Sequence, residues 1–102
     1  MAQVIEVRLL SEVDGSHLTD MFTQASSHEE AVRLALNAWS GGRSVMKGMH
    51  KAEGVEQGKW DRRGPCFTYQ YQVDLEGKDK NDGSTFDWGV VAVLFAQYKE
   101  EK

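Results

Sequence analysis

The residues from Phe67 to Glu76 alternate between two kinds of side chain. Aromatic and aliphatic residues take one set of positions and polar residues take the other, a pattern typical of a β-strand with one buried face. The apolar set is Phe67, Tyr69, Tyr71, Val73 and Leu75, and the polar set is Thr68, Gln70, Gln72, Asp74 and Glu76. Any fold of this chain must therefore contain a sheet, with a layer that covers its apolar face.

A second strand is predicted at 85–96, after the polar loop 77–84, so that the two strands form a hairpin. This strand is apolar on both faces. One face carries Phe86, Trp88, Val90, Ala92 and Leu94, and the other carries Val91, Val93 and Phe95. One helix can cover only one of these faces, and a large exposed apolar patch is uncommon in monomers. We therefore expect the second face to be covered either by a second copy, which makes a homodimer, or by residues 41–65.

The clearest helix signal is the capping box from Ser27 to Glu30, in which a serine hydroxyl and a glutamate carboxylate satisfy free amides at the start of a helix. It predicts a helix over 28–40 that ends at the glycine pair 41–42. The residues expected to be buried follow helical spacing. They are Ala31, Leu34, Ala35, Ala38 and Trp39, with Val32 and Leu36 widening the stripe.

A further hairpin is predicted at 2–24, because residues 3–10 alternate and Asp14-Gly15 favours a turn. Residues 44–52 are consistent with either a strand or a loop. The resulting order is β-β-α-β-β-β. We expect a two-layer α+β fold, in which an antiparallel sheet of about four to five strands carries one helix on one face. The whole chain, 1–102, is expected to form a single domain.

Residues 41–65 differ from the rest of the chain in composition. They hold six of the ten glycines, and six basic against three acidic side chains make them positive in a chain of net charge −4. Three interpretations remain: a solvated connection, a contact with a partner protein, or a contact with nucleic acid. The candidate partner-binding residues are Arg43, Lys47, His50, Lys51, Lys59, Trp60, Arg62 and Arg63.

Several function classes lack support in the sequence. No window is apolar for long enough to span a membrane, and the start of the chain has no cationic leader. The single cysteine, Cys66, forms no intrachain disulfide, which favours a cytoplasmic location. One cysteine and three scattered histidines do not make a metal site, and no motif predicts a cofactor or a catalytic set.

The sequence therefore predicts a small, acidic, non-enzymatic interaction protein that binds a partner protein. In size, acidity and layout, with one helix on a small antiparallel sheet, the chain is similar to several groups of small phage-encoded inhibitors. Some of these block host defence complexes such as CRISPR effectors, and the likeness implies inhibition by binding. The alternative is a nucleic-acid-binding module that uses the basic residues between Arg43 and Arg63.

Overall fold

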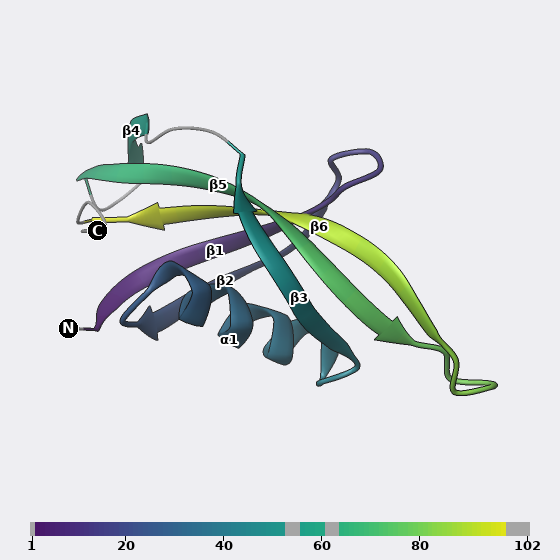
Figure 1. The fold of residues 1–102 in the computed structure, drawn as a ribbon. Coiled ribbons are helices and arrows are strands. Elements are labelled where there is room, and N and C mark those ends of the chain that lie inside the picture. The colour runs from purple at the N-terminus through teal and green to yellow at the C-terminus, as the bar shows by residue number, and fades with distance from the viewer. Residues whose placement is uncertain (1, 53–55, 61–63, 98–102) are drawn as a thin grey trace.

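The computed structural model describes residues 2–52, 56–60 and 64–97, which form an antiparallel sheet with one helix on one face (Figure 1). The sheet order is β2-β1-β6-β5-β3, and β4 pairs with β5 further along the edge that β3 occupies. The predicted α+β class is confirmed, and so is the order β-β-α-β-β-β for the helix and the five strands of the main path; β4 is an additional strand that pairs only with β5. The elements are β1 (Gln3–Ser11), β2 (His17–Ala25), α1 (His28–Ser40), β3 (Ser44–Lys51), β4 (Glu56–Trp60), β5 (Gly64–Lys78) and β6 (Thr85–Ala96).

The first hairpin forms as the alternation predicts. β1 and β2 pair in an antiparallel register from Gln3 opposite Ala25 onwards. In the turn, Gly15 has a positive φ of 73°, which glycine adopts without strain, and the Asp14 carboxylate accepts a hydrogen bond of 2.9 Å from the amide of Ser16. Local turn chemistry therefore brings the two strands together.

The helix α1 begins and ends where the sequence predicts. The Ser27 hydroxyl accepts from the amide of Glu30 at 3.1 Å, and the Glu30 carboxylate accepts from the amide of Ser26 at 2.6 Å. At the other end Gly41 is left-handed, and its amide donates to the carbonyl of Asn37. The capping box thus works largely as predicted, with the glutamate reaching one residue further back.

The buried stripe of α1 differs from the prediction at two positions. Leu34 is 43 % exposed and Ala38 is exposed, whereas Val32 and Leu36, expected only at its margin, are buried. The stripe keeps helical spacing but is rotated toward the row that begins at His28. The reason is that α1 packs mainly against β2 and β3, and the direction of those strands selects the row that is covered.

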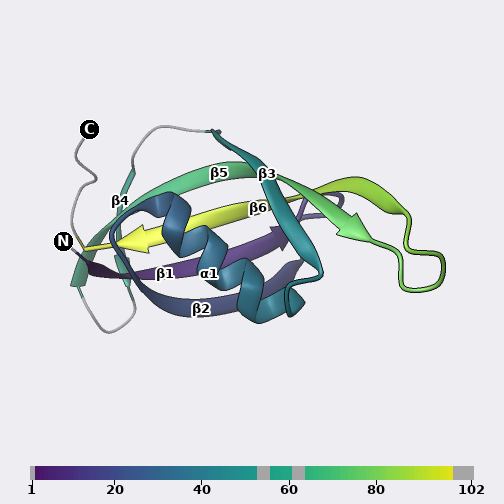
Figure 2. The same cartoon turned by 60° about the horizontal axis from the view of Figure 1, so that its bottom comes forward.

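The core lies between α1 and the sheet face that Figure 2 shows behind the helix. β6 occupies the middle of the sheet, and its residues Val90, Ala92, Leu94 and Ala96 are fully buried. They lie between the buried apolar residues of β1 on one side and those of β5 on the other. The neighbouring residues are Ile5, Val7 and Leu9 of β1, and Tyr69, Tyr71, Val73 and Leu75 of β5.

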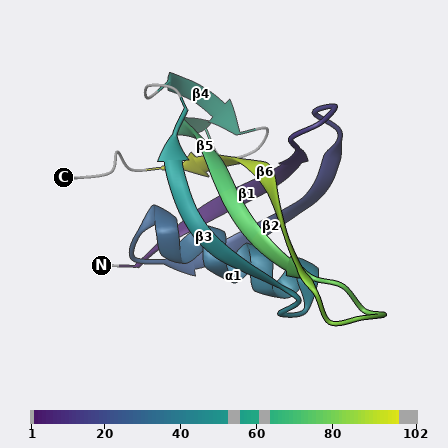
Figure 3. The same ribbon diagram turned by 45° about the vertical axis from the view of Figure 1, so that its right-hand side comes forward.

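The described parts of residues 41–65 extend the sheet at its edge. β3 pairs with residues 71–77 of β5 and β4 pairs with residues 64–68, so the two strands lie end to end along one edge (Figure 3). The register shifts between Met46 and Gly48. Because of this bulge, Met46 and Met49 both pack toward the core, which corrects the simple alternation expected over 44–52.

The second face of the sheet is therefore not crossed by β3 or β4. Val91, Val93 and Phe95 are half-buried on it, and Phe22 on β2 is 57 % exposed. The guanidinium of Arg8 lies 5.2 Å from the centre of the Phe95 ring. This second face is hereafter the outer face. The homodimer predicted from its apolar residues stays a prediction.

Across the described residues, no helix combines the length and the apolar character that crossing a bilayer requires.

Replacing Ser27 with Ala removes the acceptor at the start of α1. We expect the free energy of unfolding to fall by about 0.5–2 kcal/mol, as for other N-cap serines. Thermal unfolding followed by circular dichroism measures this, with Ser26→Ala as control, since Ser26 contributes its backbone amide. Equal melting temperatures for Ser27→Ala and the wild type would mean that the cap does not stabilise the helix.

If a second copy covers the outer face, burial of each of Val91, Val93 and Phe95 releases only part of the roughly 1.5–3 kcal/mol for a fully exposed side chain, because all three are already half-buried. Phe95→Asp should then convert a dimer into a monomer in sedimentation velocity runs. The control is Leu34→Asp, which places the same charge on the exposed side of α1 and should leave the mass unchanged. A wild type that sediments as a monomer at high concentration would contradict self-association.

Candidate functional site

The β5–β6 hairpin extends beyond the end of β1, as Figures 1 and 2 show. β1 pairs with β6 only over residues 90–96, whereas β5 pairs with β6 from Thr85 to Ala96. The first residues of β6, including Phe86 and Trp88, therefore have a neighbouring strand on one side only. Their rings lie where the core of the sheet ends, and Phe86 is 48 % exposed.

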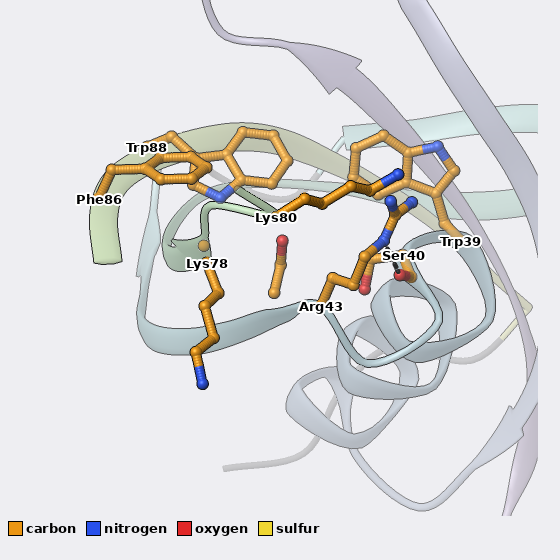
Figure 4. Close-up of a pocket in the computed structure, with 9 residues that line it drawn as sticks. Trp39, Ser40, Arg43, Lys78, Lys80, Phe86 and Trp88 are labelled. Carbon is orange, nitrogen blue, oxygen red and sulfur yellow. Dashed lines mark hydrogen bonds between the residues drawn. The ribbon is translucent and has the colours of Figure 1, made fainter. Parts of the chain in front are cut away.

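A cavity of about 280 Å³ lies here, between the end of α1, the start of β3 and the loop end of the β5–β6 hairpin (Figure 4). We call it the hairpin pocket. Among the described residues, three aromatic and three basic side chains contribute to its lining, and no carboxylate does. The lining residues are Trp39, Ser40, Arg43, Ser44, Gly77, Lys78, Lys80, Phe86 and Trp88.

The absence of a side chain at Gly77 shapes one wall of the hairpin pocket. Gly77 pairs with Phe86 across the hairpin. A Cβ atom placed on Gly77 would lie 2.6 Å from Cζ of Phe86 and 3.0 Å from Nε1 of Trp88, which is too close for normal contacts. Because Gly77 has no side chain, the rings of Phe86 and Trp88 can lie over the backbone of β5.

The opposite wall comes from the last turn of the helix. The ring centre of Trp39 lies 5.8 Å from that of Trp88, with the ring planes tilted by 45°. This separation is normal for interacting aromatic pairs. The contact joins α1 to the hairpin at the level where β1 no longer accompanies β6.

The basic side chains of the hairpin pocket differ in direction. Arg43 is held in place, because its Nε donates a 3.0 Å hydrogen bond to the carbonyl of Ser40 at the end of the helix. In Figure 4 the side chains of Arg43 and Lys80 both run toward the indole of Trp39, whereas Lys78 points away. Two cations are thus presented beside aromatic rings.

Two polar atoms at the hairpin pocket are buried without a hydrogen-bond partner among the described residues. They are Oγ of Ser40, a residue that is only 7 % exposed, and Nε1 of Trp88. A buried donor without an acceptor costs roughly 1–3 kcal/mol relative to a satisfied one. Both groups can donate a hydrogen bond, so the hairpin pocket is rich in donors.

The structure separates the basic residues that the sequence placed in one patch. Arg43 lies at the hairpin pocket, while Lys47 contacts an acidic residue of β6 and His50 contacts one of β5. Lys47 Nζ is 2.9 Å from Asp87 Oδ1, and His50 Nε2 is 3.1 Å from Asp74 Oδ2. The hydrogen bond with Asp87 and its negative charge raise the pKa of Lys47.

The remaining candidates lie elsewhere. Lys51 Nζ is 5.8 Å from the centre of the Tyr69 ring. Lys59 and Trp60 belong to β4, at the far end of the same edge, and Arg62 and Arg63 lie outside the described residues. The described candidates therefore do not form one continuous basic surface.

A second hollow, of about 470 Å³, lies beside the pairs Lys47–Asp87 and His50–Asp74. It is larger than the hairpin pocket, but its lysine already contacts a carboxylate and its histidine is hydrogen-bonded to another. A ligand there would have to displace these contacts. The hairpin pocket presents cations that no lining carboxylate neutralises, so we regard it as the stronger candidate site.

Within the described residues, no group of three or more metal-ligating side chains is close enough to hold an ion. Cys66 is buried at the start of β5, and a buried thiol is less accessible to a reactant than the exposed thiolate that nucleophilic chemistry needs.

Comparison of the chain with protein-family models, with curated proteins and with solved structures gave no match. The candidate site therefore stands on its own geometry.

Sequence reasoning identified Arg43 but missed the other main residues of the hairpin pocket. Trp39 and Trp88 were expected in the core, and Lys80 in a solvated loop. One signal was present: the hairpin predicted at 67–96 is longer than the strand at 3–10 that has to pair with it. The end of such a hairpin lacks a neighbour, so its aromatic residues remain accessible.

A methyl group at Gly77 should disturb the aromatic wall. In Gly77→Ala we expect the indole N–H resonance of Trp88 to shift. We also expect the free energy of unfolding to fall by about 1 kcal/mol. This is the lower end of the range for overpacking, because Phe86 is half exposed and can move. Two-dimensional NMR and thermal unfolding measure these effects. Gly48→Ala is the control, since its Cβ would meet no atom closer than 3.5 Å. An unmoved Trp88 resonance in Gly77→Ala would contradict this account of the wall.

Proposed function

We propose that this chain is a non-catalytic binding protein that acts by occupying the surface of a partner protein, with the hairpin pocket as the anchor. The observation that carries the proposal is the combination of three aromatic rings and an oriented, un-neutralised arginine in one concave site. Tryptophan and arginine are enriched among the residues that dominate binding energy at protein interfaces, where they lie in well-packed pockets.

Charge supports a partner with an acidic contact surface. Arg43, Lys78 and Lys80 lie around the hairpin pocket without a lining carboxylate, whereas the chain as a whole carries −4. The local positive field would attract an acidic surface and orient it, because charge complementarity favours the correct encounter. Binding of this kind blocks whatever the covered surface does, which is also the mode of action of the small phage inhibitors of similar layout.

The nucleic-acid alternative has less support from the described residues. Lys47 and His50 are paired with Asp87 and Asp74, so these two candidates would have to leave their partners before they met phosphate. A nucleic-acid contact also needs a stripe of cations that follows the backbone. Nuclease treatment during affinity capture tests this alternative.

Affinity capture from a lysate of the natural host, quantified by mass spectrometry, tests the proposal. A double variant, Arg43→Glu with Lys80→Glu, should reduce capture of the partner at least about tenfold, which corresponds to the loss of one good charged contact. The matched control is Arg33→Glu with Lys51→Glu. It changes the net charge equally but alters two exposed residues that do not line the hairpin pocket.

Three results would contradict the proposal. One is a partner that the pocket variant captures as well as the wild type does. Another is loss of capture only in Arg62→Glu with Arg63→Glu, which would return the contact to the patch predicted from sequence. The third is capture that nuclease treatment abolishes, which would favour the nucleic-acid module.

A further inference from the structure

We infer that the hairpin pocket accepts an acidic peptide segment of the partner in which a carboxylate lies next to an aromatic side chain; this inference rests on the proposed function. The carboxylate would meet Arg43 and Lys80, and the aromatic ring would lie against Trp39 and Phe86.

The ionic groups of the site are all donors. Arg43 uses its Nε on the carbonyl of Ser40, which leaves its terminal N–H groups in a fixed position. Such a fork binds a carboxylate through two parallel hydrogen bonds. Lys80 adds an ammonium group, and none of the lining residues is an aspartate or glutamate. The ligand must therefore supply the acceptors and the negative charge.

The unsatisfied donor of Trp88 points to the same class of ligand. Nε1 of Trp88 is closed off from water and has no partner among the described residues. Lys80, from the loop of the same hairpin, extends toward Trp39 in Figure 4. When Lys80 swings toward an incoming carboxylate, the second carboxylate oxygen can accept from Nε1, and the cost of the unsatisfied group is removed.

The aromatic walls of the site favour a ligand in which a flat, apolar group lies next to the carboxylate. Trp39, Phe86 and Trp88 surround the cavity on two sides, and an added ring would make edge or offset contacts with them. Such aromatic pairs contribute beyond the area that they bury. An aromatic residue beside an aspartate or glutamate satisfies both halves of the site.

The size of the cavity favours a side chain over a nucleotide. Sites for small molecules usually measure ~300–1,000 Å³ and enclose most of their ligand. The hairpin pocket measures about 280 Å³ and is open on one side. It suits one ring and an adjacent carboxylate that arrive as part of a larger partner.

The probe is a blocked peptide, Gly-Asp-Phe-Asp-Gly, titrated into isotope-labelled protein while the indole N–H resonances are followed by NMR. The resonance of Trp88, assigned with Trp88→Phe, should move downfield and saturate as Nε1 gains an acceptor. Replacing both aspartates of the peptide with asparagine, or its phenylalanine with alanine, should weaken binding at least about tenfold each, about 1.4 kcal/mol.

Two protein variants separate a lost donor from a lost ring. Trp88→Phe keeps a ring but removes Nε1, so calorimetry should show weaker peptide binding, by at least about threefold. Its matched control is Trp39→Phe, whose indole N–H has no assigned role and whose effect should be smaller. Arg43→Glu with Lys80→Glu should abolish the Trp88 shift, whereas Arg33→Glu with Lys51→Glu, which lie outside the lining, should preserve it.

The outcomes distinguish this inference from the proposed function. If capture of a partner depends on the pocket residues but the peptide does not displace that partner, the inference is overturned and the proposed function stands. A Trp88 shift that adenosine monophosphate or a short single-stranded RNA produces more strongly than the peptide would also overturn it, and would assign the site to nucleotides. Peptide binding that survives charge reversal of Arg43 and Lys80 would place the ligand elsewhere.

Discussion

The pairing of β1 with β6 is the contact on which the remainder of the structure depends. It joins Ile5–Ser11 to Val90–Ala96, so it links the first hairpin of the chain to the last. Without it the sheet would divide into the β1–β2 hairpin, which alone is at best marginally stable in water, and a separate sheet of β3 to β6. Because β6 then lies in the middle of the sheet, its fully buried face becomes the centre of the core beneath α1.

The unequal lengths of the paired strands account for the candidate site. β6 has twelve residues but pairs with β1 over only seven of them, so residues 85–89 have β5 as their only neighbouring strand among the described residues. The aromatic residues Phe86 and Trp88 belong to this unsupported part. Trp88 packs against Trp39 from the helix, and both rings lie over Gly77, which leaves a concave site where the two layers separate. The hairpin pocket thus forms where the packed core of the sheet ends.

The electrostatic organisation also depends on which face of the sheet each side chain reaches. On the outer face, cations are matched: Arg8 contacts Asp20 at 2.9 Å, and Lys47 contacts Asp87 at the same distance. Partial burial acts to raise the pKa of Asp20, but the hydrogen bonds from Arg8 and His17 and their charges outweigh it and lower that pKa. At the hairpin pocket, Arg43 is oriented by a backbone carbonyl instead, so its charge remains available.

The sequence by itself determined the features that depend on residues close to one another in the chain. Ser27, Glu30 and Gly41 define the ends of α1, because capping involves groups at most four residues apart. Alternation defined β1, β5 and β6 and the fold class, because side chains of a strand repeat every two residues. Only the tertiary structure decided the rotation of α1, the bulge at Met46–Gly48, the edge position of β4 and the meeting of Trp39, Arg43, Lys80 and Trp88. These features arise from contacts between distant segments, whose register sets the face and the depth that each side chain reaches.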